Sequence, residues 1–161
     1  MTVRRAERKD TPRIQQLLWQ VEQVHHRIRP DLFRDGGRKY TDAQLADILA
    51  DDARPVLAAV DENDRLLGYA FCKFVEYRDD NIMQDRRTLY LDDLCVDETL
   101  RGQHIGRALF EAVRDYARAH GCRDLTLNVW TGNDAARRFY ESCGFRPPQG
   151  LHGLRTVIFG I

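Results

Sequence analysis

The chain has 161 residues, of which 43% are hydrophobic and 31% charged, proportions typical of a soluble globular protein rather than a disordered, collagenous or fibrous one. A chain of this length can bury a core without disulfides or metals, so we expect residues 1–161 to form a single domain. Lys plus Arg and Asp plus Glu both number 25. The resulting zero formal net charge gives no bulk attraction to nucleic acid, and we expect no nucleic-acid partner.

The sequence predicts a cytoplasmic protein with neither a membrane partner nor a metal site. Its apolar runs are all shorter than the roughly 20 residues of a membrane span, and its charged N-terminal segment lacks the apolar stretch of a signal peptide. The cysteines Cys72, Cys95, Cys122 and Cys143 are too far apart for a metal-binding spacing. The first three lie in or beside apolar segments, where free thiols commonly pack as small core residues.

The first half of the chain predicts a strand, two helices and a hairpin. The expected elements are a strand at 2–5, a helix from 10–12 to near Arg29, a shorter helix capped at 41–42, strands at 56–60 and 66–75, and a solvated loop at 78–87. Pro12 suits the first turn of a helix, and Pro30 disfavours a helical residue before it. An acidic turn at 61–64 joins the two apolar strands into the hairpin.

The second half predicts strands alternating with helices. The expected elements are a strand at 89–96, a glycine-containing loop at 97–106, a helix from Ala108 to Gly121, a strand at 125–129, a helix from Asn133 to Ser142 ended by Gly144, a loop at 147–150 and a strand at 155–159. The helix assignments rest on apolar residues at helical spacing. The order β-α-α-β-β-β-α-β-α-β indicates a mixed α/β domain.

The most informative stretch runs from Leu94 to Gly106, where a strand enters a glycine-containing loop that opens into a helix. Such a loop directs free backbone N–H groups at one spot, and the helix dipole adds partial positive charge there. The natural ligand is a phosphate or pyrophosphate. The spacing fits neither a P-loop nor a dinucleotide fingerprint, and it equally fits a strand–turn–helix connection that binds nothing.

Two segments resemble one known family. Arg101-Gly-Gln-His-Ile-Gly106 resembles the R/Q-x-x-G-x-G/A pyrophosphate loop of the GNAT superfamily of N-acetyltransferases. Residues 133–145 (NDAARRFYESCGF) resemble that superfamily's N-x-x-A-x-x-F-Y-x-x-x-G-F segment. The strand at 89–96 (LYLDDLCV) is also similar to the corresponding strand of polyamine acetyltransferases.

The resemblance implies the GNAT fold, a mixed, mostly antiparallel central sheet with flanking helices, whose middle strands, here 89–96 and 125–129, splay apart. Acetyl-CoA would lie in the gap as cosubstrate, without a metal. The implied cofactor-binding residues are Leu94, Cys95 and Val96 for the pantetheine arm, Arg101, Gly102, Gln103, His104, Ile105, Gly106 and Arg107 for the pyrophosphate, and Asn133, Ala135 and Ala136 beside them.

The resemblance also implies roles in acetyl transfer. Tyr140 matches the family's tyrosine that protonates the departing thiolate; otherwise it is an aromatic packed beside Phe139. Asp92 is the first candidate for the base and Asp93 the second, because a buried or paired carboxylate can have its pKa raised enough to act through water. Without a bulge, adjacent strand residues face opposite sides, and at most one of the two acids would then reach the cleft. A backbone N–H near Leu94 would serve the oxyanion.

The chain departs from the family pattern at two positions. His104 stands where the family usually has glycine, which carries a conformational cost if that position needs a positive φ. The family also often has glutamate where Asp92 stands, and the shorter side chain favours a role relayed through water.

The acceptor should enter between the first helix, the loop after it and the connection after Val75. The candidate substrate-binding residues are His25, Arg29, Phe33, Tyr77 and Trp130. We expect the acceptor to be a primary amine of a small molecule or peptide. Acids at 92, 93, 97 and 98 suit a cationic acceptor, and the arginines of the entry loop could equally recruit a carboxylate. A non-catalytic acyl-CoA-binding sensor or subunit is the alternative. Association into a homodimer stays open.

Overall fold

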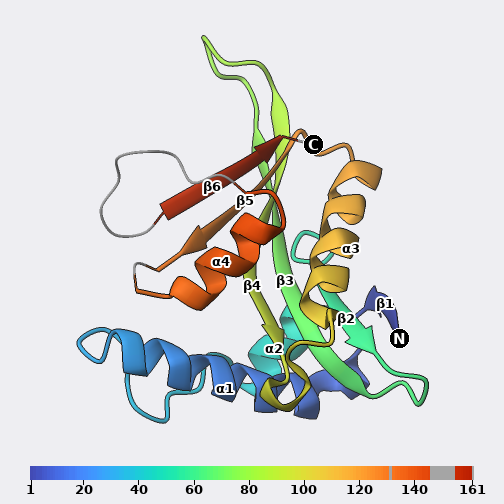
Figure 1. Ribbon diagram of the computed structural model, residues 1–161. Coiled ribbons are helices and arrows are strands. Elements are labelled where there is room, and N and C mark those ends of the chain that lie inside the picture. The colour runs from blue at the N-terminus through green and yellow to red at the C-terminus, as the bar shows by residue number, and fades with distance from the viewer. Residues whose placement is uncertain (131, 146–154, 161) are drawn as a thin grey trace.

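The computed structural model describes all atoms of residues 1–130 and 132–145 and the backbone of 155–160 (Figure 1). Its elements are β1 (Thr2–Arg5), a 3₁₀ turn (Arg8–Asp10), α1 (Thr11–Ile28), α2 (Asp42–Leu49), β2 (Val56–Val60), β3 (Leu66–Tyr77), β4 (Arg86–Val96), a second 3₁₀ turn (Glu98–Leu100), α3 (Ile105–Ala119), β5 (Asp124–Val129), α4 (Asp134–Ser142) and β6 (Arg155–Gly160). The predicted order of elements is confirmed. The loop predicted at 147–150 lies outside the described residues.

The strands form one open, six-stranded sheet in the order β1-β2-β3-β4-β5-β6. Every neighbouring pair is antiparallel except β4 and β5, which run parallel. The α3 helix is the crossover between those two strands, as parallel neighbours require. The mixed, mostly antiparallel sheet expected from the sequence is therefore confirmed.

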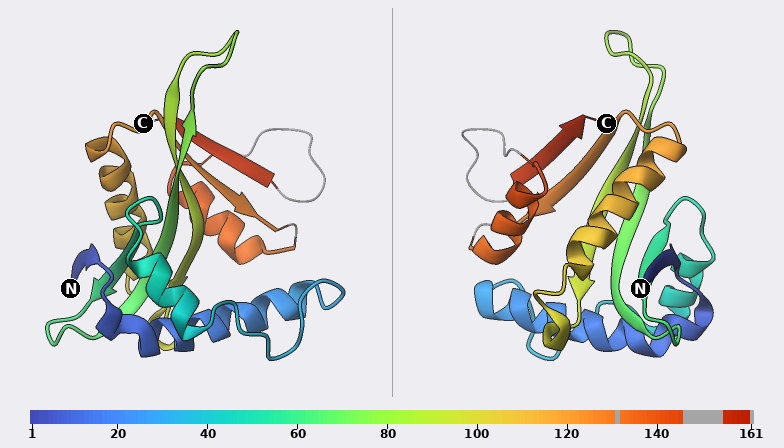
Figure 2. Two further views of the ribbon diagram at one scale, coloured as in Figure 1. Left: turned by 180° about the vertical axis from the view of Figure 1, so that it is seen from behind. Right: turned by 45° about the vertical axis from the view of Figure 1, so that its right-hand side comes forward.

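Helices cover both faces of the sheet, and alternate residues of β2 show how (Figure 2). Val56 and Ala58 belong to a core with α1 and α2, whereas Leu57 and Ala59 belong to a core with α3. All five residues of β2 are buried, because a strand covered on both faces reads as a continuous apolar run. The sheet thus separates two hydrophobic cores.

Local sequence signals set the helix ends. Thr41 caps α2 by accepting a hydrogen bond from the Gln44 N–H, and Asn133 caps α4 through the Ala136 N–H. Gly121 and Gly144 adopt positive φ values of 68° and 96° just after α3 and α4, as glycines that end helices commonly do. No helix in the described part of the chain is long and apolar enough to cross a membrane.

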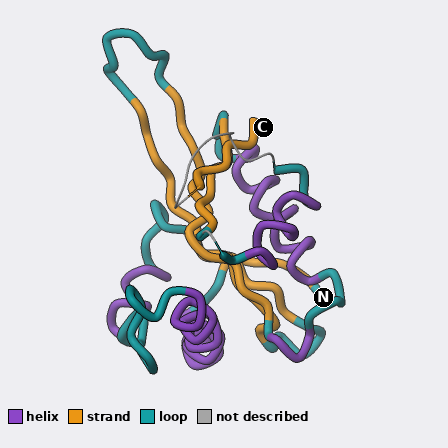
Figure 3. The backbone as a smooth tube through the Cα atoms, turned by 60° about the vertical axis from the view of Figure 1, so that its left-hand side comes forward, coloured by secondary structure: helices purple, strands orange, loops and turns teal. Residues whose placement is uncertain are grey.

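The β3–β4 hairpin is longer than predicted and projects from the body of the molecule (Figure 3). Glu76 lies opposite Arg87 across the two strands, with Arg87 Nε 2.9 Å from Glu76 Oε1. The guanidinium of Arg87 also lies 3.9 Å from the ring centroid of Phe74. Such cross-strand pairs stabilise the ends of paired strands. Residues 86 and 87 belong to β4, so the prediction that they lie in a loop was wrong.

Gly68 lies opposite Val96, where β3 supports the end of β4. A Cβ at position 68 would lie 2.7 Å from the carbonyl oxygen of Cys95 and 3.0 Å from Leu109 Cδ1. Replacing Gly68 by Ala should therefore lower the free energy of unfolding by about 1–3 kcal/mol, measured by chemical denaturation.

Gly37→Ala is the matched control, because a Cβ there would meet nothing closer than the Arg34 carbonyl oxygen at 3.4 Å. Its unfolding midpoint should stay near that of the wild type. Equal midpoints for the two variants would contradict the close approach at Gly68.

Candidate functional site

The two middle strands, β4 and β5, are paired along only part of their length. Parallel pairing joins Thr88–Leu91 of β4 to Asp124–Leu127 of β5, whereas β4 stays paired with β3 as far as Val96. No described strand pairs with residues 92–96 on the side that faces β5. The splayed middle strands expected from the sequence are thus confirmed, and they leave one edge of β4 open.

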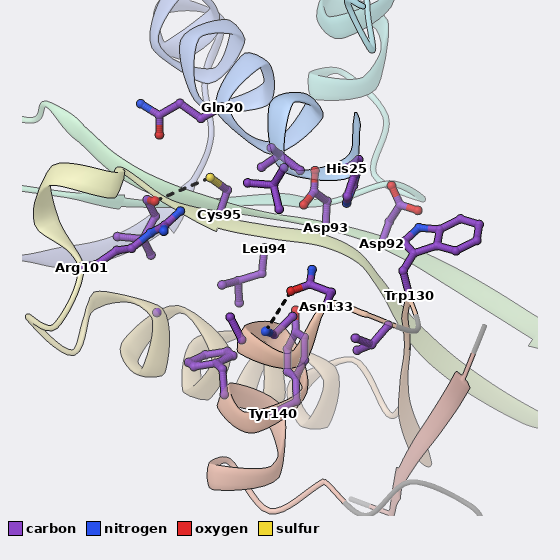
Figure 4. A pocket seen from close by; sticks show the side chains of 18 of the residues that line it. Gln20, His25, Asp92, Asp93, Leu94, Cys95, Arg101, Trp130, Asn133 and Tyr140 are labelled. Carbon is purple, nitrogen blue, oxygen red and sulfur yellow. Dashed lines mark hydrogen bonds between the residues drawn. The ribbon is translucent and has the colours of Figure 1, made fainter. Parts of the chain in front are cut away.

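A cavity of about 900 Å³ lies at this opening, within the size range of small-molecule and cofactor sites. It is lined from α1 and the loop after it, from the end of β4, from the loop and first turn of α3, from the end of β5 and from α4 (Figure 4). The cofactor-binding residues predicted from the sequence line it, with one exception: Leu94, Cys95, Val96, Arg101, Gly102, His104, Ile105, Gly106, Arg107, Asn133, Ala135 and Ala136. Gln103, the exception, is exposed outside the lining.

The first turn of α3 presents its backbone to one end of the cavity. The first N–H groups of a helix have no partner within it, and here these belong to Ile105, Gly106 and Arg107. His104 occupies the N-cap position without a side-chain cap bond. Gly106 lies against α4, because a Cβ there would be 3.3 Å from Phe139 Cε2. Free donors at a helix N-terminus suit a phosphate group.

His104 adopts φ 61°, in the left-handed region. The position where the family usually has glycine therefore does need a positive φ, and histidine is strained there. The side chain lines the cavity without disturbing the backbone path that exposes the N–H groups of the helix.

Asp97 is buried beneath this loop and does not line the cavity. The expectation that it contributes a negative charge near the acceptor was therefore wrong. It is 5% exposed, pairs with Arg13 of α1 and accepts bonds from the Thr99 N–H and hydroxyl at 3.0 and 2.9 Å. Burial opposes ionisation, but the Thr99 and Arg13 contacts hold the pKa of Asp97 below its usual value. Glu98 also lies outside the cavity lining.

Asp92 and Asp93 both line the cavity, whereas the expectation of at most one applied to a strand without a bulge. Phe71 pairs with Asp93 and Cys72 with Leu91, which leaves Asp92 as the extra residue of a β-bulge. A bulge bends the strand and re-aims side chains. Both carboxylates consequently project to the same side of β4 (Figure 4).

The two acids differ in their surroundings. The Asp92 side chain is 40% exposed, whereas that of Asp93 is 9% exposed. The hydroxyl of Tyr69 donates to Asp93 Oδ2 at 3.1 Å. Burial of Tyr69, together with the charge of Asp93, raises the pKa of that phenol well above its usual value, so Tyr69 stays a donor. Asp93 is therefore the more firmly oriented carboxylate.

The α4 helix brings Asn133 and Tyr140 to the opposite wall (Figure 4). Asn133 Oδ1 accepts from the Ala136 N–H at 3.1 Å, which leaves its amide N–H groups for a ligand. The ring of Tyr140 packs against Phe139, Phe110 and Phe145 at centroid distances of 5.1, 6.5 and 5.8 Å. Burial, and then the charge of Asp93, raises the pKa of the Tyr140 phenol.

Aromatic side chains form the end of the cavity remote from α3. Phe33 lies between His25 and Trp130, with ring centroids 5.0 and 5.6 Å away. The three residues line the cavity, as the predicted acceptor site requires. His26 Nδ1, 2.7 Å from the Phe33 carbonyl oxygen, fixes the loop that carries Phe33.

Two predicted substrate-binding residues lie elsewhere. Tyr77 is on the projecting hairpin, at the end of the sheet remote from α1 (Figure 1), where Arg86 lies 4.2 Å from its ring centroid. It lies there because β3 runs on past Val75 and carries Tyr77 outward. Arg29, at the end of α1, bonds to Asp31 at 2.7 Å and lies outside the cavity lining.

Sequence reasoning missed several cavity residues, above all Lys39. Its Nζ lies 3.3 Å from Asp92 Oδ2 and 3.4 Å from Asp93 Oδ2. Tyr90 and Asn128 also line the cavity, with Asn128 Nδ2 donating to the Tyr90 hydroxyl at 3.2 Å across the gap. A loop lysine carries no local signal that would place it at the distant acids. Within the described ranges, no cluster of His, Cys, Asp and Glu could hold a metal ion.

The geometry agrees with comparisons to known proteins. The family model described as "Acetyltransferase (GNAT) family" matches residues 18–145. The crystal structure of a tetramutant of the BH1408 protein from Bacillus halodurans is 35% identical, with a TM-score of 0.87, over 94% of this chain and 97% of that one. PaiA N-acetyltransferase from Thermoplasma acidophilum, solved with coenzyme A, shares the fold at 14% identity, with a TM-score of 0.78 over 99% and 98% of the two chains.

Two curated relatives match over shorter stretches. N-alpha-acetyltransferase 30 from Schizosaccharomyces pombe is 31% identical over 84 residues, which cover 52% of this chain and 53% of that protein. Histone acetyltransferase MCC1 from Arabidopsis thaliana is 32% identical over 107 residues, 60% of this chain and 43% of that protein. The chain thus spans about half the length of these two relatives.

The strain at His104 predicts a gain in stability. Replacing His104 by Gly should raise the free energy of unfolding by about 1 kcal/mol, because a left-handed conformation penalises any residue with a Cβ. Gln103→Gly is the control: Gln103 is the adjacent loop residue, and its φ is outside the positive region, so glycine there adds only chain entropy to the unfolded state. The check is urea denaturation, and a His104→Gly protein no more stable than the Gln103→Gly protein would refute the strain.

Proposed function

The chain belongs to the acetyltransferase (GNAT) family, and we propose that it transfers the acetyl group of acetyl-CoA directly to a primary amine of a small molecule or peptide, within a ternary complex. The observation that carries the proposal is the cavity where β4 leaves β5, with free helix N–H groups at one end and two carboxylates at the other. The proposal treats residues 1–161 as one catalytic domain.

The phosphates of acetyl-CoA would bind at the first turn of α3, on the N–H groups of residues 102–107. The pantetheine arm would pair with Leu94, Cys95 and Val96 as an added strand, because that edge of β4 has peptide groups without a strand partner. Such pairing places the thioester beside the end of β4, between Tyr140 and the carboxylates. The amide of Asn133 supplies donors along the arm.

Acetyl transfer needs a neutral amine, and the carboxylates supply a place for its proton. We assign Asp93 as the first base, with Asp92 beside it, because Asp93 is the more buried and is oriented by Tyr69. The amine nitrogen attacks the acetyl carbonyl carbon and its proton passes to the carboxylate, directly or through water. A backbone N–H near Leu94 stabilises the oxyanion. The C–S bond then breaks, and the thiolate takes the proton of the Tyr140 hydroxyl.

Asp93→Asn should lower turnover about 10²–10⁴-fold, the usual contribution of a general base. The loss should be greatest at low pH, where most of the acceptor amine is protonated and needs the base. Asp92→Asn, at the more exposed acid, should lose less. The measurement is a pH–rate profile of both variants with the best amine of a panel, and an Asp93→Asn profile that overlays the wild type would exclude Asp93 as the base.

Tyr140→Phe removes one hydroxyl, so CoA affinity should change little while kcat falls about 10²–10⁴-fold, roughly 3–5 kcal/mol of barrier. Because its pKa is raised, Tyr140 should stay protonated beyond pH 10, and the wild-type rate should show no loss of this acid below that pH. Tyr77→Phe, outside the cavity, is the matched control and should behave as the wild type.

Steady-state kinetics with release of free thiol as the readout tests the assignment. A Tyr140→Phe enzyme that keeps more than half of the wild-type kcat would return Tyr140 to a packing role. A wild-type protein that binds CoA but releases no thiol with any amine of the panel would identify the chain as a non-catalytic acyl-CoA-binding module.

A further inference from the structure

Lys39 occupies a place in the cavity that the proposed reaction does not use. It comes from the loop between α1 and α2, and its ammonium lies between the two carboxylates, 3.3 Å from Asp92 Oδ2 and 3.4 Å from Asp93 Oδ2. The side chain is 25% exposed and lines the cavity. A cation from a distant loop thus closes the acidic end of the site.

The pair of carboxylates requires such a cation. Two adjacent ionised acids on one side of a strand repel each other, and the bulge at Asp92 imposes this arrangement. Burial opposes the charge of Lys39, but the fields of Asp93 and Asp92 outweigh it and raise the pKa of the ammonium. The free protein therefore holds one positive charge between the acids.

We propose that Lys39 holds, in the free protein, the place of the acceptor's ammonium, so that the acceptor must itself be a cation that displaces the Lys39 side chain from Asp92 and Asp93. This inference rests on the proposed function and adds to it the charge of the acceptor and the residue that selects for that charge. Lys39 would thus determine specificity without touching the reacting atoms. Its ion pairs with Asp92 and Asp93 select for an acceptor whose positive charge can replace its own.

The contacts allow this exchange. Both ion pairs are longer than the 2.7–2.9 Å of a strong charged hydrogen bond, and a lysine side chain moves about many rotatable bonds. The backbone of the loop is held independently, by the Gln15 amide donating to the Tyr40 carbonyl oxygen at 3.0 Å and by Tyr40 stacking on Phe71. The side chain can leave while the loop stays.

The exchange keeps the charge at the two acids balanced. A cation replaces a cation, so a charged acceptor enters without leaving a buried charge unpaired, whereas a neutral molecule would have to leave Lys39 in place. The ion pairs of Lys39 with Asp92 and Asp93 therefore favour a cationic acceptor over a neutral one.

Lys39→Gln, which removes the competing charge, tests the proposal. The probe is butylamine, with butanol as its neutral counterpart, titrated calorimetrically into the protein saturated with CoA, which permits binding without turnover. Butylamine should bind Lys39→Gln about three- to tenfold more tightly than the wild type, and its affinity should fall more steeply with salt. Butanol should bind the two proteins alike.

Two further variants serve as controls. Lys39→Arg keeps a cation in place and should bind butylamine about as the wild type does, and Lys73→Gln, at an exposed lysine of β3 outside the cavity, should change nothing. Butylamine binding that is weaker or unchanged in Lys39→Gln would overturn the proposal, because Lys39 would then only hold the carboxylates in position.

A second readout follows the side chain itself. The chain has three lysines, Lys9, Lys39 and Lys73, so the side-chain nitrogen resonances of protein labelled with 15N-lysine can be followed by NMR, with Lys73 as internal standard. Butylamine with CoA should shift the Lys39 resonance relative to that of Lys73, and butanol should not. An unchanged Lys39 resonance would contradict displacement. Failure of CoA to bind would instead refute the proposed function.

Discussion

Hydrogen bonds between β4 and β5 stop at Leu91 and Leu127, whereas those between β3 and β4 continue to Val96. The last part of β4 is therefore held firmly on one edge and open on the other. An open edge inside a protein has peptide groups that need partners, and the cavity next to it has the volume for a cofactor. The position of the cavity is therefore set by the point where the pairing of β4 with β5 ends.

Helices on both faces of the sheet complete the walls of the cavity at that opening. The loop at 97–104 leads from β4 into α3, whose first residues line the same cavity. Gly106 lets α4 approach closely enough to complete the wall. The buried Asp97 ties the intervening loop to Arg13 of α1. One strand end thereby connects the proposed phosphate-binding turn, the acids and the proposed acceptor wall.

The acids depend on a second irregularity, the bulge at Asp92. Without it Asp92 and Asp93 would face opposite sides of the sheet; with it they share a side, and Tyr69 and Lys39 are their partners. A fixed pair of negative charges explains both the proposed proton transfer and the proposed preference for a cationic acceptor. The bulge thus determines that both carboxylates point into the acidic end of the cavity.

The order of elements and the loop that leads into α3 could be predicted from the sequence, because they depend on local signals. Apolar spacing, the caps Thr41 and Asn133 and the glycines at 121 and 144 act within a few residues, and the structure has each of them. The loop motif likewise specifies its own backbone path, including the positive φ at His104.

Three features that the sequence did not reveal depend on contacts between residues that are separated in the chain. The bulge at Asp92 depends on how β4 pairs with β3, and strict alternation cannot reveal it. The hairpin extends beyond its predicted ends, where Glu76 pairs with Arg87 across the strands, and Tyr77 therefore lies outside the cavity. Lys39 reaches acids more than fifty positions later in the chain, a contact without any local pattern.

Amide hydrogen exchange with and without CoA tests the central claim most directly, since it reports on the backbone groups that the gap leaves open. The account predicts that CoA slows exchange in two segments, the end of β4 at 92–96 and the loop and first turn of α3 at 102–107, while the paired residues 88–91 change little. Saturating CoA that leaves both segments unprotected, or that protects only other parts of the chain, would contradict it.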